Sequence, residues 1–119
     1  MRLDARVEVR VVAAGAEGSP ARDVALIRLG GAPEIGPPGW AALRDLPEGA
    51  AAGHEANCRC CAGRSGLADM MMQLFAERAK DQIGFFRAVF VSVPSSLVCE
   101  TVTILAHDPV IAGRYRVDR

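Results

Sequence analysis

An amphipathic helix followed by a short, fully apolar strand is the pattern that most restricts the fold of this chain. Apolar residues recur at helical spacing over residues 67–80, namely Leu67, Met70, Met71, Leu74 and Phe75. Residues 88–91 then form an unbroken apolar run, which is typical of a strand covered on both faces in a parallel sheet. Pro94 ends this strand, because proline cannot donate to the ladder. This order of elements indicates an α/β fold.

The remaining elements follow from shorter patterns. Charged and valine residues alternate from residue 6 to residue 13, as in a half-buried strand. We also expect a strand over 24–29, two helical turns over 40–46, a helix over 97–105 and a short helix from Pro109 to about Tyr115, capped by Asp108. The 119 residues suit one domain. We predict a single small α/β domain over 1–119, with a partly parallel sheet and flanking helices.

Composition and charge exclude several classes of partner. Fourteen basic and fourteen acidic residues cancel, so nothing favours nucleic acid or an anionic membrane. The first ten residues carry charges at nearly every second position, which fits no signal peptide, and no apolar run approaches the roughly 18 residues of a membrane span. We therefore expect a cytoplasmic protein, whose thiols stay reduced.

Three cysteines stand within four residues, at Cys58, Cys60 and Cys61. Cys58 and Cys61 form a C-x-x-C pair, a spacing that brings two sulfurs onto one metal ion across a tight turn. Arg59 and Arg64 are close in sequence and favour the thiolate form. Thiolate clusters prefer soft ions such as zinc. We call residues 54–65 the thiol loop and interpret it as a metal site; plain packing and a redox dithiol are the alternatives.

Three sulfurs leave one position of a tetrahedral zinc site open. His54, Glu55 or the distant Cys99 can fill it, and His54 is the local candidate that we select. Cys99 itself lies in an expected helix and is predicted to be a buried apolar residue. His107, beside Asp108, is expected at the surface or in a cap. The run Met70, Met71 and Met72 is interpreted as core packing rather than as a copper site.

The thiol loop and the residues after it resemble a known family. Cys58-Arg-Cys-Cys61, the helix, the strand at 86–91 and Asp108-Pro-Val-Ile-Ala-Gly-Arg-Tyr-Arg-Val-Asp118 are similar, in order and spacing, to CobW-like P-loop GTPases over about residues 54–119. Members of that family are metal-handling GTPases implicated in zinc or cobalt trafficking. The resemblance implies a truncated P-loop-GTPase-like domain in which the three cysteines bind the metal.

The nucleotide-binding half of the family pattern is missing. A Walker A loop needs G-x-x-x-x-G-K-[ST], but residues 15–20 are Gly-Ala-Glu-Gly-Ser-Pro, and the only lysine in the chain is Lys80. Glu17 in that turn would repel a phosphate. After the strand at 86–91, residues 92–95 are Ser-Val-Pro-Ser instead of the family's E-[ST]-[ST]-G. We therefore expect no bound nucleotide and no GTP hydrolysis.

A shortened sheet predicts an exposed edge. Family members continue into a further strand and a second domain, whereas this chain ends at Arg119. An uncovered edge and apolar face favour a homo-oligomer or a partner protein. The leading hypothesis is a non-catalytic, metallochaperone-type protein that uses the thiol loop. The alternatives are a degenerate structural subunit that binds a partner without metal transfer, and a thiol redox protein.

Overall fold

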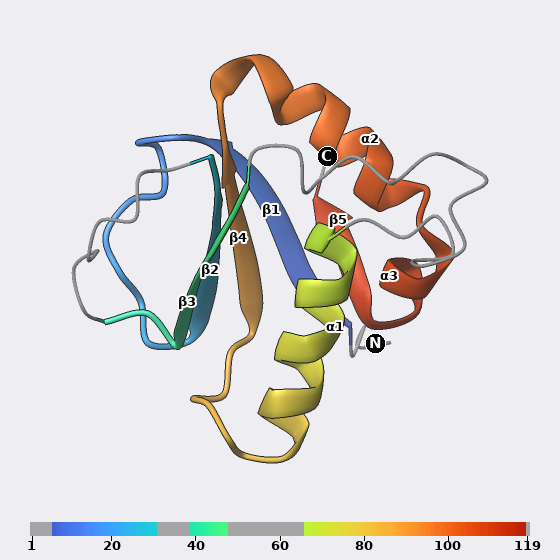
Figure 1. The fold of residues 1–119 in the computed structure, drawn as a ribbon. Helices are drawn as coiled ribbons and strands as arrows, with labels where there is room; N and C mark the ends of the chain where they lie inside the picture. The colour runs from blue at the N-terminus through green and yellow to red at the C-terminus, as the bar shows by residue number, and fades with distance from the viewer. Residues whose placement is uncertain (1–5, 31–38, 48–65, 119) are drawn as a thin grey trace, which may run out of the picture.

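The computed structural model describes residues 6–30, 39–47 and 66–118 (Figure 1). Five strands form one parallel sheet in the order β3-β2-β4-β1-β5. The elements are β1 (Val7–Ala13), β2 (Val24–Leu29), β3 (Ala42–Leu46), α1 (Gly66–Ala79), β4 (Ala88–Val93), the short 3-10 helix η2 (Ser95–Leu97), α2 (Val98–Ala106), α3 (Pro109–Arg114) and β5 (Tyr115–Asp118). The predicted α/β class is confirmed, and the sheet is parallel throughout rather than in part.

The three α-helices of the described residues lie on one face of the sheet (Figure 1). Alternate residues of the strands point into a single core with them, as Val9, Val89 and Ile27 do from three neighbouring strands. From the helices, the buried members of this core are Leu67, Ala68, Met71, Leu74, Leu105 and Ile111. Every second residue of a strand therefore faces the helices, as the period of two in a β-strand requires.

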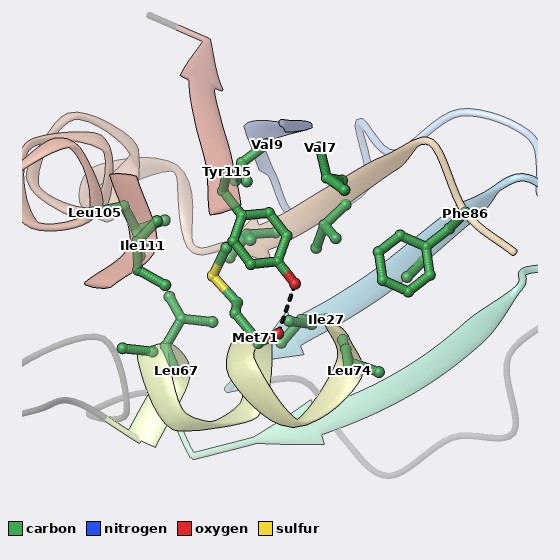
Figure 2. Packing of buried hydrophobic residues seen from close by; sticks show 14 of the residues in the cluster. Val7, Val9, Ile27, Leu67, Met71, Leu74, Phe86, Leu105, Ile111 and Tyr115 are labelled. Carbon is green, nitrogen blue, oxygen red and sulfur yellow. Dashed lines mark hydrogen bonds between the residues drawn. The ribbon is translucent and has the colours of Figure 1, made fainter. Parts of the chain in front are cut away.

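Tyr115 links the last strand to the first α-helix. Its ring is buried in the core, and its hydroxyl donates a hydrogen bond of 2.5 Å to the carbonyl oxygen of Met71 (Figure 2). The ring also meets Phe75 edge to face, with 5.8 Å between centroids. Burial raises the pKa of Tyr115 well above its usual range. The hydroxyl thus stays protonated and holds β5 against the middle of α1.

The second face of the sheet is covered without a helix among the described residues. Ser92 on this face donates a hydrogen bond of 2.6 Å to Glu17, so the connection from β1 to β2 crosses β4 here. Trp40 packs edge-on against Phe90, at 6.4 Å between centroids. Gly39 has a φ of +128°, and a Cβ there would lie 3.0 Å from Cβ of Pro20. Only glycine lets the connection from β2 to β3, which contains Gly39, approach the connection from β1 to β2, which contains Pro20, so closely.

Two elements differ from the sequence-based expectation. The helix predicted over 40–46 is wrong, because residues 42–46 form β3 and pair in parallel with β2, Leu26 opposite Leu43. Pairing with the edge of β2 satisfies the backbone groups of this segment and overrides its helical spacing. The helix after Asp108 is confirmed, but it ends at Arg114, and the four-residue strand β5 that follows was missed.

Replacing Met71 by alanine tests the helix-covered core. Met71 is 0% exposed and its neighbour Met72 is only half-buried. We expect Met71→Ala to lower the free energy of unfolding by about 2–5 kcal/mol, since it leaves a cavity that the core cannot close. Met72→Ala is the matched control and should cost clearly less. Urea denaturation followed by circular dichroism measures both, and equal losses would contradict this placement of α1.

Candidate functional site

The predicted metal ligands lie outside the described residues. Cys58, Cys60, Cys61 and His54 all fall between β3, which ends at Leu46, and α1, which begins at Gly66. Since β3 and β4 are parallel, the chain leaves the carboxyl edge of the sheet at Leu46 and returns along α1 to the amino edge. The carboxyl edge, where α/β sheets commonly bind their ligands, is thus where β3 ends before this part of the sequence.

The helix that follows the thiol loop is anchored from its first turn. Leu67 and Ala68 are completely buried in the core, one residue after α1 begins. Asp69 in the same turn is exposed, and its negative charge is favourable near a helix N-terminus. The carboxyl side of the thiol loop thus continues directly into a rigidly packed element.

The described residues include one cysteine, Cys99, in the first turn of α2, and one histidine, His107, which caps the C-terminal end of α2. Cys99 is a free, exposed cysteine, so the prediction that it is buried is wrong. Its position in the first turn points it to solvent, while Thr101 and Leu105 take the buried side. His107 ends the helix, exposed, with Nδ1 2.8 Å from the Thr103 carbonyl oxygen, as expected for a surface residue in a cap. No group of three or more His, Cys, Asp or Glu that suits a metal occurs in the described parts.

Glu17 occupies the turn after β1, at the centre of the carboxyl edge. Its Oε1 accepts hydrogen bonds from Ser92 Oγ at 2.6 Å and from the Gly15 backbone N–H at 3.1 Å. Partial burial raises the pKa of Glu17. The two hydrogen bonds and the charge of Arg28 together lower this pKa by more than burial raises it, so the pKa lies below its ordinary value. Glu17 is therefore a carboxylate at neutral pH.

This carboxylate lies at the topological switch point of the sheet. β1 and β4 are neighbours, and the backbone N–H of Ala14 donates to the Val93 carbonyl oxygen at 2.7 Å where both strands end. From this point the connection after β1 runs over the second face, whereas α2 after β4 lies on the helix-covered face. Such a divergence forms the usual ligand crevice of an α/β sheet. Here the Glu17 carboxylate and the Ser92 hydroxyl interact across this crevice.

Sequence reasoning missed the pairing of Glu17 with Ser92. In the sequence, the two residues stand only in separate segments, 15–20 and 92–95, that depart from the family's nucleotide-binding motifs. The signal that joins them is topological: the turn after β1 meets the end of β4 only because these strands are neighbours in the sheet. They stand 75 positions apart in the sequence, and no local pattern connects them.

Comparison with protein-family models, with curated proteins and with solved structures gives no match for this chain. Within the described ranges, no helix has the length and apolar character to cross a membrane.

Ser92→Ala tests the carboxylate at the switch point. The variant removes the strongest of the interactions that lower the pKa of Glu17, so this pKa should rise towards its ordinary value. Because a lowered carboxyl pKa adds stability above the unfolded-state pKa that is lost on acidification, the stability gap between wild type and variant should shrink as the pH falls. NMR titration of the Glu17 carboxyl carbon measures the shift. Ser95→Ala, at an exposed serine, is the control; a Glu17 pKa that Ser92→Ala leaves unchanged would contradict the contact.

Proposed function

We propose that this chain is a non-catalytic, CobW-like metal-binding protein that holds a zinc or cobalt ion in its thiol loop. Cys58, Cys60 and Cys61 supply three thiolates and His54 the fourth ligand. The observation that carries the proposal is the C-x-C-C cluster itself, three thiols within four residues. So dense a cluster has little use in packing, and soft thiolates select zinc-like ions over hard ones.

The arrangement of the fold supports this proposal. The thiol loop joins two elements of the carboxyl edge, and the helix on one side of it is fixed by Leu67 in the core. A loop bound to a rigid scaffold can place ligands reproducibly without folding anew around each ion. Binding then needs deprotonation of the thiols, so metal affinity should fall as the pH is lowered.

The turn after β1, at the centre of the carboxyl edge, supports a carrier role without a nucleotide. The turn after β1 leads to β2 without a helix, and its Gly15 N–H already donates to the Glu17 carboxylate. A second anion at this amide would meet the charge of Glu17. We propose that metal transfer therefore proceeds by ligand exchange alone: a ligand of the recipient displaces His54, and the thiolates then release the ion stepwise.

Titration of the reduced protein with Co(II) tests the proposal. Thiolate coordination gives a charge-transfer absorption, which should saturate at about one Co(II) ion per chain. Zn(II) added afterwards should displace Co(II) and abolish this absorption. The double variant Cys58→Ser, Cys61→Ser should lose this absorption, because the chelating pair is gone. Cys99→Ser removes one thiol elsewhere and should titrate like wild type, since Cys99 is exposed on α2. Unchanged affinity in the double variant would refute the metal site.

His54→Ala tests the fourth ligand separately. We expect a site that still shows thiolate-to-cobalt absorption, with weaker affinity and an altered visible spectrum, because the fourth position passes to water. Glu55→Gln is the neighbouring control and should leave both unchanged. If Glu55→Gln or Cys99→Ser weakens binding while His54→Ala does not, the assignment of His54 is wrong.

The edges of the sheet support a second candidate function, binding of a partner protein. β3 and β5 each pair on one side only within the described chain, and β5 has just four residues. Unpaired edges are sites for a further strand from a second copy or from another protein. In this case native mass spectrometry should show a complex that persists in the Cys58→Ser, Cys61→Ser variant. A protein that is monomeric at every stage, from the cell extract to the pure sample, would contradict the partner-binding function.

A further inference from the structure

Phe85 is the one large hydrophobic side chain exposed in the described parts of the chain, at 68%. It belongs to the segment between α1 and β4, at the amino edge of the sheet. Its neighbour Phe86 is fully buried in the core, and a Cβ on Gly84 would lie 3.7 Å from the backbone of Ala41. The backbone on both sides of Phe85 is therefore packed, and the ring is held out in solvent rather than left there by a loose loop.

Two arginines lie against phenylalanine rings here: Arg78 contacts Phe85 and its neighbours, and Arg114 contacts Phe75. The guanidinium of Arg78 lies 4.1 Å from the centroid of Phe85, 5.2 Å from that of Phe86 and 5.4 Å from that of Phe75. Arg114 lies 5.3 Å from the centroid of Phe75. All these distances are within the roughly 6 Å over which a ring attracts a cation. We call Phe75, Arg78, Phe85, Phe86 and Arg114 the arginine–phenylalanine cluster.

These two arginines have no carboxylate partner among the described residues, unlike most others. Carboxylates lie within 4.0 Å of the guanidinium groups of Arg10, Arg28, Arg44, Arg87 and Arg116. Arg78 and Arg114 contact aromatic rings instead, and Nε of Arg78 is buried without a hydrogen-bond acceptor in the described structure. Arg78 thus lies beside the exposed ring of Phe85 and Arg114 beside the neighbouring ring of Phe75, and neither has a carboxylate within 4.0 Å among the described residues.

We propose that the arginine–phenylalanine cluster docks an acidic segment of a partner protein, in which carboxylates flank a large apolar side chain. The carboxylates pair with Arg114 and Arg78, and the apolar side chain covers Phe85. Arginine and aromatic residues are the side chains that most often dominate interface energies. Two arginines are too few for the phosphate contacts of a nucleic-acid site, and the balanced charge of the chain gives no general attraction for polyanions.

The cluster is separate from the proposed metal site. Arg78 lies in the last turn of α1, and Arg114 directly precedes the first residue of β5, so the cluster is at the amino edge. The thiol loop precedes α1 in the sequence and shares no residue with the cluster. The proposal does not depend on metal binding.

Fluorescence anisotropy with a defined peptide tests the proposal. The probe is a fluorescein-labelled peptide that alternates Glu and Asp with Leu and Phe, and the comparison peptide carries Lys in place of every acidic residue. Full-length protein should bind the acidic probe, with an affinity that falls as salt is added, because the charges are exposed. Phe85→Ser and Arg114→Gln should each weaken binding about tenfold or more.

Arg10→Gln is the matched control. Arg10 also stacks on a phenylalanine, 5.7 Å from the centroid of Phe90, but on the second face of the sheet. It should bind the probe like wild type. Phe85 and Arg114 are exposed, so thermal unfolding should show that both variants keep the fold.

Three results would overturn the proposal. The acidic probe could bind no better than the basic one, or Arg10→Gln could weaken binding as much as Arg114→Gln does. Sedimentation velocity provides the third: a dimer that Phe85→Ser dissociates would show that a second copy of this chain, and not an acidic partner segment, covers the cluster.

Discussion

A parallel sheet must be covered on both faces, and this requirement shapes the whole chain. Three helices cover one face, where Val9, Ile27 and Val91 meet the buried side of α1. On the other face the cover comes from the connection 14–23 and from Trp40, which packs on Phe90. This connection leads from β1 to β2 without a helix, so one face of the sheet is covered by a loop and not by a helix.

The ends of the sheet consequently differ in chemistry. At the carboxyl edge, the negative charge of Glu17 lies at the switch point, where Ser92 donates a hydrogen bond to it. At the amino edge, Arg78 and Arg114 bring positive charge among phenylalanine rings. Between the edges, the hydrogen bond from the Tyr115 hydroxyl to the Met71 carbonyl oxygen holds β5 against the middle of α1. The proposed acidic partner segment therefore suits the amino edge, where the arginines lie, and not the carboxyl edge, where Glu17 lies.

Much of the fold could be predicted from local patterns, because long periodic segments report burial directly. Residues 66–79 and 88–93 show their helix and strand in the spacing of apolar residues. Short edge strands could not be predicted in the same way: Ala42–Leu46 has helical spacing, and only pairing with β2 makes it a strand. The thiol cluster is visible in the sequence at once, whereas Glu17 with Ser92, and Arg78 with Phe85, are brought together by the fold.

The central claim is that the thiol loop holds a soft metal ion in the native protein. Its most direct test is the metal content of the chain after purification under reducing conditions without added metal, by elemental analysis, with native mass spectrometry to count ions per chain. We expect about one zinc or cobalt ion per chain, as a single tetrahedral site requires. Protein that is metal-free and stays so after incubation with stoichiometric Zn(II) would contradict it.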